Sequence, residues 1–247
     1  MQLRRNEIRG FTLVELAIVL LVVTLLLGSI LVPLASQVEQ RKVAEAQQLL
    51  DDSREAIIGF AMMNGRLPRP AASATDGVEM SATCASLPDP TKDAAANCTG
   101  FIPWATLGLS RLDPWGKQLR YSVDPNFADS AFTFSTAKTY HKRVCPSASS
   151  CTTPVATGVP AVILSHGQEN WGYRDDGGQV ADSSSTNTDE DANDSKFKCT
   201  TAANCTDFIA RTTSENPTST GGEFDDLVVW ISDSLLFNRM VAAGRLP

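Results

Sequence analysis

A single carboxylate stands at the edge of a long uncharged segment near the start of the chain. Glu15 precedes Leu16–Ala35, twenty residues without a charged side chain, of which fourteen are Leu, Ile or Val. A carboxylate in an apolar environment is costly unless a partner offsets it, so such a residue is a functional candidate. The chemistry open to Glu15 is ion pairing with a cation inside that environment.

The bond between Gly10 and Phe11 separates this segment from a short basic leader, in which residues 1–10 hold three arginines and one glutamate. The joining stretch reads Gly10-Phe11-Thr12-Leu13-Val14-Glu15-Leu16. It resembles the prepilin signature shared by type IV pilins and by the pseudopilins of type II secretion. The resemblance implies that prepilin peptidase cuts after Gly10, on the cytoplasmic side, and that the new amine of Phe11 is N-methylated.

The same resemblance implies a role for Glu15, which would pair with the Phe11 amine of a neighbouring subunit. Cleavage leaves a cationic amine at the end of an apolar helix, and Glu15 supplies one anion per subunit to offset it. The implied partners are other pilin or pseudopilin subunits, prepilin peptidase and the inner-membrane assembly platform.

Two other interpretations of the apolar segment are disfavoured. An ordinary secretory signal would be cut near Pro33-Leu34-Ala35, where Pro33 is a poor residue for the cleavage site. An uncut signal anchor is the other. As a helix, Leu16–Ala35 would span about 30 Å, the thickness of a bilayer core. Together with this length, the resemblance implies a single-pass precursor in the bacterial inner membrane with its head in the periplasm, and later a periplasmic or cell-surface filament.

Six cysteines indicate disulfides, because an even number in an exported domain is typical of them. Their clustering favours three local pairs, and a metal site is disfavoured because no spacing is C-x2-C and the chain has two histidines. The expected pairs are Cys84–Cys98, Cys145–Cys151 and Cys199–Cys205.

The most polar part of the chain runs from Asp175 to Asp194, with seven acidic residues and no Lys or Arg. We expect a long exposed loop there. Within it Asp189, Asp191 and Asn193 alternate as calcium ligands do, although an EF-hand loop would need Gly at position 194 and Glu at position 200. Pseudopilins of the resembled type bind calcium in an acidic loop. Two alternatives stay open, a solvated loop and a calcium site, and no other cofactor is expected.

Catalysis has little support in the sequence. The two histidines are His141 and His166, and no G-x-S-x-G, H-E-x-x-H or phosphate-binding loop accompanies them. His166 follows an apolar run, where a structural role is the commoner one. We predict that the protein is not an enzyme.

A long helix must position these residues. After the apolar segment, residues 36–63 are rich in helix-forming residues and carry an apolar stripe at helical spacing that includes Val38, Ala46, Leu49, Ile57 and Phe60. Asn64-Gly65 is a good left-handed cap. The predicted parts are therefore the leader at 1–10, an apolar membrane or filament-core helix at 11–35, its amphipathic continuation at 36–63 and a head at 64–247.

The head is predicted to be α+β, with an antiparallel sheet packed on the long helix, disulfide-tied loops and a short C-terminal helix. Its four expected strands are 119–123, 131–135, 161–165 and 227–231, and its final helix is 234–243. Asp113-Pro114-Trp115-Gly116 makes a tight turn before the first strand. This turn resembles one in the pseudopilin head, that of the major pseudopilin in particular.

The net charge of the chain excludes one class of function. Loss of the leader would remove three cations and one anion and change the formal net charge from −7 to −9. We therefore expect no nucleic-acid binding, because that needs a positive surface. A basic cluster around His141, namely Lys138, Lys142 and Arg143, is expected to be solvated.

The predicted function is a structural subunit of a type IV pilus or a type II secretion filament. The alternatives are a minor pilin at the tip that binds a surface or cargo, and, less favoured, a membrane-anchored exported enzyme.

Overall fold

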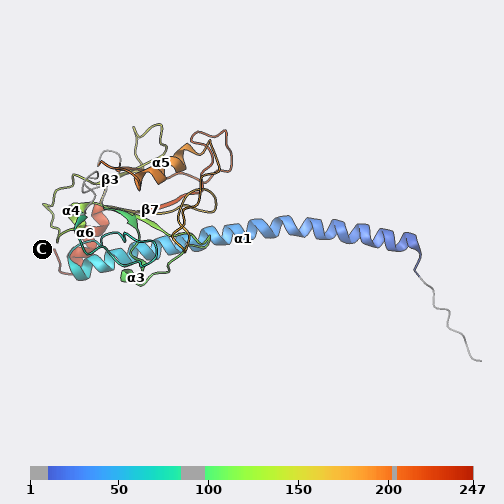
Figure 1. Ribbon diagram of the computed structural model, residues 1–247, viewed down its shortest axis with the longest axis horizontal. Coiled ribbons are helices and arrows are strands. Elements are labelled where there is room, and N and C mark those ends of the chain that lie inside the picture. The colour runs from blue at the N-terminus through green and yellow to red at the C-terminus, as the bar shows by residue number, and fades with distance from the viewer. Residues whose placement is uncertain (1–10, 85–97, 202–204, 247) are drawn as a thin grey trace, which may run out of the picture. The chain divides into compact units, whose positions relative to one another are not determined.

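The long helix α1, Leu13–Asn64, dominates the first part of the chain in the computed structural model (Figure 1). The structure describes residues 11–84, 98–201 and 205–246, with the side chains of residues 27–35 left out of the description. Two compact units divide the chain, Met1–Lys42 and Val43–Pro247, so the last part of α1 belongs to the second unit. The predicted leader lies outside the described residues.

The second half of α1 is helical because its buried side chains recur on one face. Ala46, Leu50 and Ile57 are completely buried. The helix ends where the sequence predicts, since Gly65 adopts a positive φ of 74° and its N–H donates to the carbonyl of Ala61 at 2.7 Å.

The head, the unit Val43–Pro247, contains two sheets. The first is fully antiparallel with strand order β1-β2-β5-β7, and the second has the order β4-β3-β6, with β3 and β6 parallel. The strands are β1 Thr99–Phe101, β2 Arg120–Val123, β3 Lys142–Cys145, β4 Ala156–Val159, β5 Ala161–Ser165, β6 Asp207–Ile209 and β7 Leu227–Ile231.

Strand β5 explains the layering, because both of its faces are buried. Ala161 and Ile163 face the core shared with α1, whereas Val162 and Leu164 face a second core shared with the other sheet. This is why the strand reads as an uninterrupted apolar run. Figure 1 shows β3 and α5 on the side of β7 that is opposite α1.

The described part of the head also contains four shorter helices. They are α3 Trp104–Leu107, α4 Pro125–Ala128, α5 Thr188–Lys196 and α6 Asp233–Ala242. The predicted C-terminal helix is confirmed as α6. Its N-cap, however, is Ser232, whose hydroxyl accepts from the Leu235 N–H.

Two sequence-based expectations about the head are wrong. Residues 131–135 form no strand. Phe132 is buried against Phe127 and Phe237 in an aromatic cluster, whereas Phe134 is 51% exposed, so the alternating pattern does not mark one buried face of a strand. The polar segment 175–194 is not a single exposed loop. It contains the start of α5, where Asp189, Asn193 and two neighbouring acidic residues are buried.

Candidate assembly site and the polar network of the head

The first turn of α1 is closed by a reciprocal pair of side chains, Thr12 and Glu15. The Glu15 N–H donates to the Thr12 hydroxyl at 3.2 Å, and the Thr12 N–H donates to the Glu15 carboxylate at 3.3 Å. This capping box satisfies two backbone donors that a helix start leaves open, and the Glu15 charge opposes the positive end of the helix dipole. The Thr-x-x-Glu spacing of these two residues is a sequence signature of the capping box.

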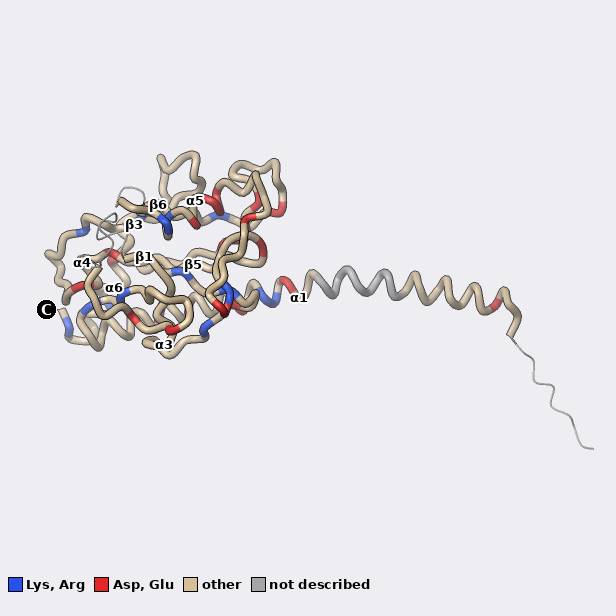
Figure 2. Tube along the Cα trace, in the orientation of Figure 1, with Lys and Arg blue, Asp and Glu red and all other residues tan. Residues whose placement is uncertain are grey.

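The side chains of residues 16–26 are exposed and, apart from Thr24, apolar. Phe11, which precedes them, is 83% exposed. Glu15 is the charged residue within residues 11–26, and Figure 2 shows the first part of α1 in tan with red near its start. Large exposed apolar areas mark surfaces that another apolar surface or lipid covers. A shallow apolar hollow on this part of the helix is lined by Leu13, Val14, Ala17, Ile18 and Leu21.

Among the described residues, no helix has a stretch that is both long and apolar enough to cross a membrane. The predicted apolar segment Leu16–Ala35 extends beyond them, because the side chains of residues 27–35 are not described. Gly10, the predicted cleavage position, also lies outside the described residues.

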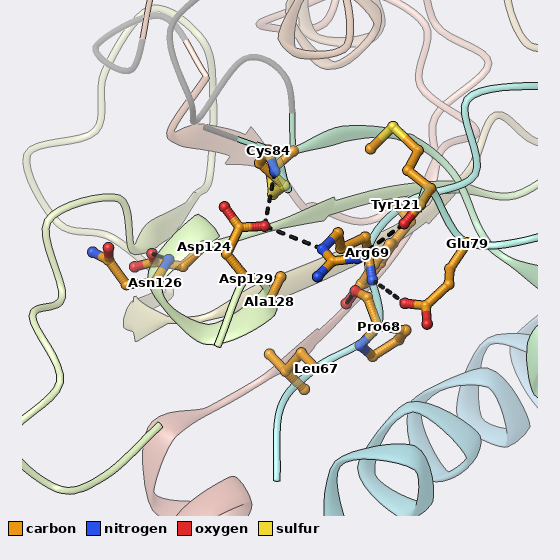
Figure 3. Close-up of a disulfide and its surroundings, with 12 residues drawn as sticks. Leu67, Pro68, Arg69, Glu79, Cys84, Tyr121, Asp124, Asn126, Ala128 and Asp129 are labelled. Carbon is orange, nitrogen blue, oxygen red and sulfur yellow. Dashed lines mark hydrogen bonds and ion pairs between the residues drawn. A yellow bond between two sulfur atoms is a disulfide. The ribbon is translucent and has the colours of Figure 1, made fainter. Parts of the chain in front are cut away.

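All six cysteines are paired as predicted, in Cys84–Cys98, Cys145–Cys151 and Cys199–Cys205. The first pair is anchored by Asp129 (Figure 3), whose carboxylate accepts the Cys84 N–H at 2.8 Å and pairs with Arg69 at 3.2 Å. Arg69 in turn donates its N–H to Glu79 at 3.1 Å. The disulfide is therefore tied to the segment that follows α1.

The three predicted calcium ligands lie on α5 and have different partners. Asp189 accepts from Arg211 at 2.7 Å, and Asp191 accepts from the Trp171 indole at 2.9 Å. Asn193 donates to the carbonyl of Ile209 at 2.9 Å and accepts its N–H at 2.7 Å. The alternating residues are thus helical and not part of an EF-hand loop. Calcium binding by them stays a prediction.

His166 lies at the centre of a buried polar network in the head. Its Nδ1 is 3.0 Å from Asp226, which also accepts from Asn193 at 2.8 Å. Burial lowers the pKa of His166 to about 3 and raises the pKa of Asp226 to about 8. Both groups are therefore neutral at pH 7, and the hydrogen bond between His166 Nδ1 and the Asp226 carboxyl group contains one proton.

The second histidine connects two helix starts. His141 has its Nδ1 2.6 Å from Asp124, the N-cap of α4, and its Nε2 2.7 Å from Asp233, the first residue of α6. Burial would lower the pKa of His141, but the two carboxylates outweigh burial and raise it. The expectation of a solvated basic cluster is therefore wrong for His141 and for Lys142, which is completely buried.

The predicted turn at Asp113 is organised by its carboxylate. It accepts the N–H groups of Trp115 at 3.0 Å and Lys117 at 2.8 Å, and the hydroxyl of Ser165 at 2.7 Å. Gly116 has a φ of 78°, a conformation that favours glycine. The turn therefore fixes Lys117 against the loop that follows β5.

The comparison with known families identifies the start of the chain. Residues 5–31 match the family model of the prokaryotic N-terminal methylation motif. The chain thus carries the signature of type IV pilins and pseudopilins, and the resemblance drawn from Gly10 to Leu16 is confirmed. No curated protein and no solved structure matches the chain. The motif supports a pilin-like subunit, a structural class of protein, and the head must be interpreted from its own geometry.

Proposed function

We propose that the protein is a structural subunit of a type IV pilus or a type II secretion filament. Prepilin peptidase cuts the precursor after Gly10 in the inner membrane, and an assembly platform then adds the mature subunit to the filament. The observation that carries this proposal is the methylation motif, whose residues include the exposed apolar surface at the start of α1.

The driving force of assembly is the transfer of the apolar part of α1 from lipid to a bundle of similar helices. Without a strong hydrophobic gain between lipid and helix, packing and polar contacts decide the association. Glu15 supplies the polar contact, because its carboxylate pairs with the Phe11 amine of a neighbour. The hollow around Ala17 gives that neighbour a surface on which to pack.

The capping box gives Glu15 a second role. In the single chain its carboxylate accepts from Thr12. Since a carboxylate has several acceptor positions, it can keep this contact and also accept from an amine. The helix start is thus ordered before the neighbour arrives, which lowers the entropy lost on assembly.

Processing is tested by intact mass and N-terminal sequencing of the protein from sheared filaments and from membranes. We expect a start at methylated Phe11 and a mass lower by six hydrogens, which corresponds to three disulfides. A start at Met1 in filament and membrane fractions would contradict processing, and a start after Ala35 would identify a freely secreted domain.

Three variants separate the charge of Glu15 from its capping role. Glu15→Ala removes both, Glu15→Gln keeps the cap because glutamine serves in a capping box, and Thr12→Ala weakens the cap but keeps the charge. We expect both Glu15 variants to reduce incorporation into filaments about tenfold or more, which corresponds to a loss of about 1.4 kcal/mol. Thr12→Ala should be close to wild type. Normal incorporation of Glu15→Gln would refute the pairing.

A second candidate is a minor subunit at the filament tip that binds a surface or a secreted cargo. The layer formed by the three-stranded sheet and α5 favours it, because the first sheet already covers α1 without this layer. Copy number separates the two candidates. A shaft subunit is the major protein of sheared filaments, whereas a tip subunit is present at a few copies per filament.

A further inference from the structure

The side chain of Lys117 ends in a cluster of backbone oxygens. Its ammonium donates to the carbonyls of His166 at 3.1 Å and Asn170 at 2.9 Å, and also to that of Glu169. These three oxygens, named here the carbonyl cluster, come from the loop 166–170 that follows β5. Lys117 is 4% exposed, so the ammonium has exchanged water for these oxygens.

The same loop is held from its other side by Asp225. Its carboxylate accepts the N–H groups of Gln168 at 2.7 Å and Glu169 at 2.8 Å. Gly167 permits this approach, because a Cβ at that position would lie 2.5 Å from the Asp225 carboxyl carbon. The loop thus points its carbonyls at the Lys117 ammonium and two of its N–H groups at the Asp225 carboxyl group.

Acidic side chains surround the ammonium at longer range. Burial lowers the pKa of Lys117, and the carboxylates of Asp225, Asp113 and Glu190 oppose this effect. Gly172 leaves room for the lysine stem, since a Cβ there would lie 2.9 Å from Lys117 Cδ. The stem is therefore closely fitted, and the position of the ammonium is defined by packing as well as by hydrogen bonds.

Backbone carbonyls and carboxylates are the ligands of hard cations such as Ca²⁺, which takes six to eight oxygens. The carbonyl cluster and the nearby carboxylates have this chemistry, but a covalently attached cation occupies the position. We propose that Lys117 is a built-in substitute for a bound metal ion, and that removal of its side chain turns the carbonyl cluster into a calcium site.

This inference does not depend on the filament role proposed above, because it concerns how the head is held together. According to this inference, the Lys117 ammonium holds loop 166–170 in its folded conformation, and the loop does not need calcium for this. It also differs from the calcium prediction for Asp189, Asp191 and Asn193, which lie on α5.

The test compares calcium binding and thermal unfolding of the full chain in detergent, for wild type and two variants. Lys117→Ala removes the charge and opens the space, whereas Lys117→Met removes the charge but fills the space with an unbranched side chain. Isothermal titration with CaCl₂ counts the sites at pH 7.5, and melting temperatures are measured in EGTA and in CaCl₂.

We expect Lys117→Ala to bind one calcium ion more than wild type. In EGTA its Tm should fall by about 5 °C or more, and calcium should raise it by about 5 °C beyond any effect on wild type. Lys117→Met should show the lower Tm without the additional site. Adding Asp225→Asn to Lys117→Ala should abolish the additional calcium site. This loss would locate the site at loop 166–170.

Equal calcium stoichiometry in Lys117→Ala and wild type would overturn the proposal, as would an unchanged Tm in EGTA. Because both results are compared with wild type, calcium bound at α5 would not affect them. If Lys117→Ala fails to fold in EGTA, recovery of folded protein in CaCl₂ supports the proposal, and failure in both conditions overturns it.

Discussion

The two ends of α1 carry similar apolar side chains in opposite environments. In the head, Leu50 is completely buried, whereas Leu20, within the first unit, is 57% exposed. Polar groups follow the same division. Glu15 has one described side-chain partner, Thr12, on its own turn, whereas Lys117, His141 and His166 of the head have partners from distant segments.

This contrast teaches where each region obtains its stability. The head itself supplies a charged or hydrogen-bonding partner for Lys117, His141 and His166. These interactions therefore stabilise the head within a single chain. The first unit presents exposed apolar surface and the Glu15 carboxylate. If the proposed function holds, one helix joins a region that is complete in the monomer to a region that neighbouring subunits cover.

The largest effect should come from matched substitutions at the two ends of the helix. Leu50→Ala removes a fully buried side chain and should cost about 3 kcal/mol of unfolding free energy. Leu20→Ala should leave the unfolding of the head within about 0.5 kcal/mol of wild type. Urea unfolding followed by tryptophan fluorescence measures both. A similar loss of unfolding free energy in the two variants would contradict the difference between the two ends of α1.

The second prediction concerns the disulfide Cys145–Cys151, which is confined to the head. Replacing both cysteines by serine should cost about 2 kcal/mol, because the bridge restricts a short loop in the unfolded chain. Processing after Gly10 should be unaffected. Thermal unfolding and N-terminal sequencing check the two statements, and loss of processing would show that the regions are coupled.

The third prediction uses the buried pair of Asp226 and His166. Asp226 has a folded pKa of about 8, above its ordinary value of 3.8, so its contribution to stability is complete below 3.8, is lost as pH rises from there to about 8, and does not change further above that pH. His166 has a lowered pKa, so its contribution is lost as pH falls below about 6.5. Asp226→Asn should therefore flatten the fall of Tm between pH 6.5 and 8, where the contribution of His166 is constant, by several degrees.

The control for this pair is NMR of the histidine rings. The chain has two histidines, so the two ring signals are simple to assign with His141→Gln. His166 should stay neutral down to a pH near 3. Titration of both rings near pH 6.5 would contradict the buried network.

The smallest effect should come from His141. Its pKa is raised, so the stabilisation by its charge is complete below about 6.5 and is lost as pH rises through the folded pKa. His141→Gln should lower Tm by roughly 3 °C at pH 6 and by less at pH 9. Because His141 and His166 have different partners, the effects of His141→Gln and Asp226→Asn should add.

The sequence was most informative where the deciding interactions are local. The methylation motif, the end of α1 at Gly65 and the three short-range disulfides depend on neighbouring residues, and all were predicted. The strands β5 and β7 were also predicted, because each is an apolar run bounded by turn residues.

Long-range pairing explains what the sequence did not reveal. Strand β3 lies parallel to β6, which is about sixty residues further along the chain, and no short pattern indicates such a partner. Helix α5 begins in a highly acidic segment. It is buried because Arg211, Asn170 and other distant groups satisfy its carboxylates. The position of Lys117 likewise depends on a loop fifty residues away.

The short disulfide loops have a consequence for what a protease could do to the head. Each bridge joins cysteines separated by fourteen, six or six residues, and none links remote parts of the fold. A single cut inside such a loop leaves both new ends attached through sulfur. A chain cut there sheds no fragment as long as the bridge stays oxidised.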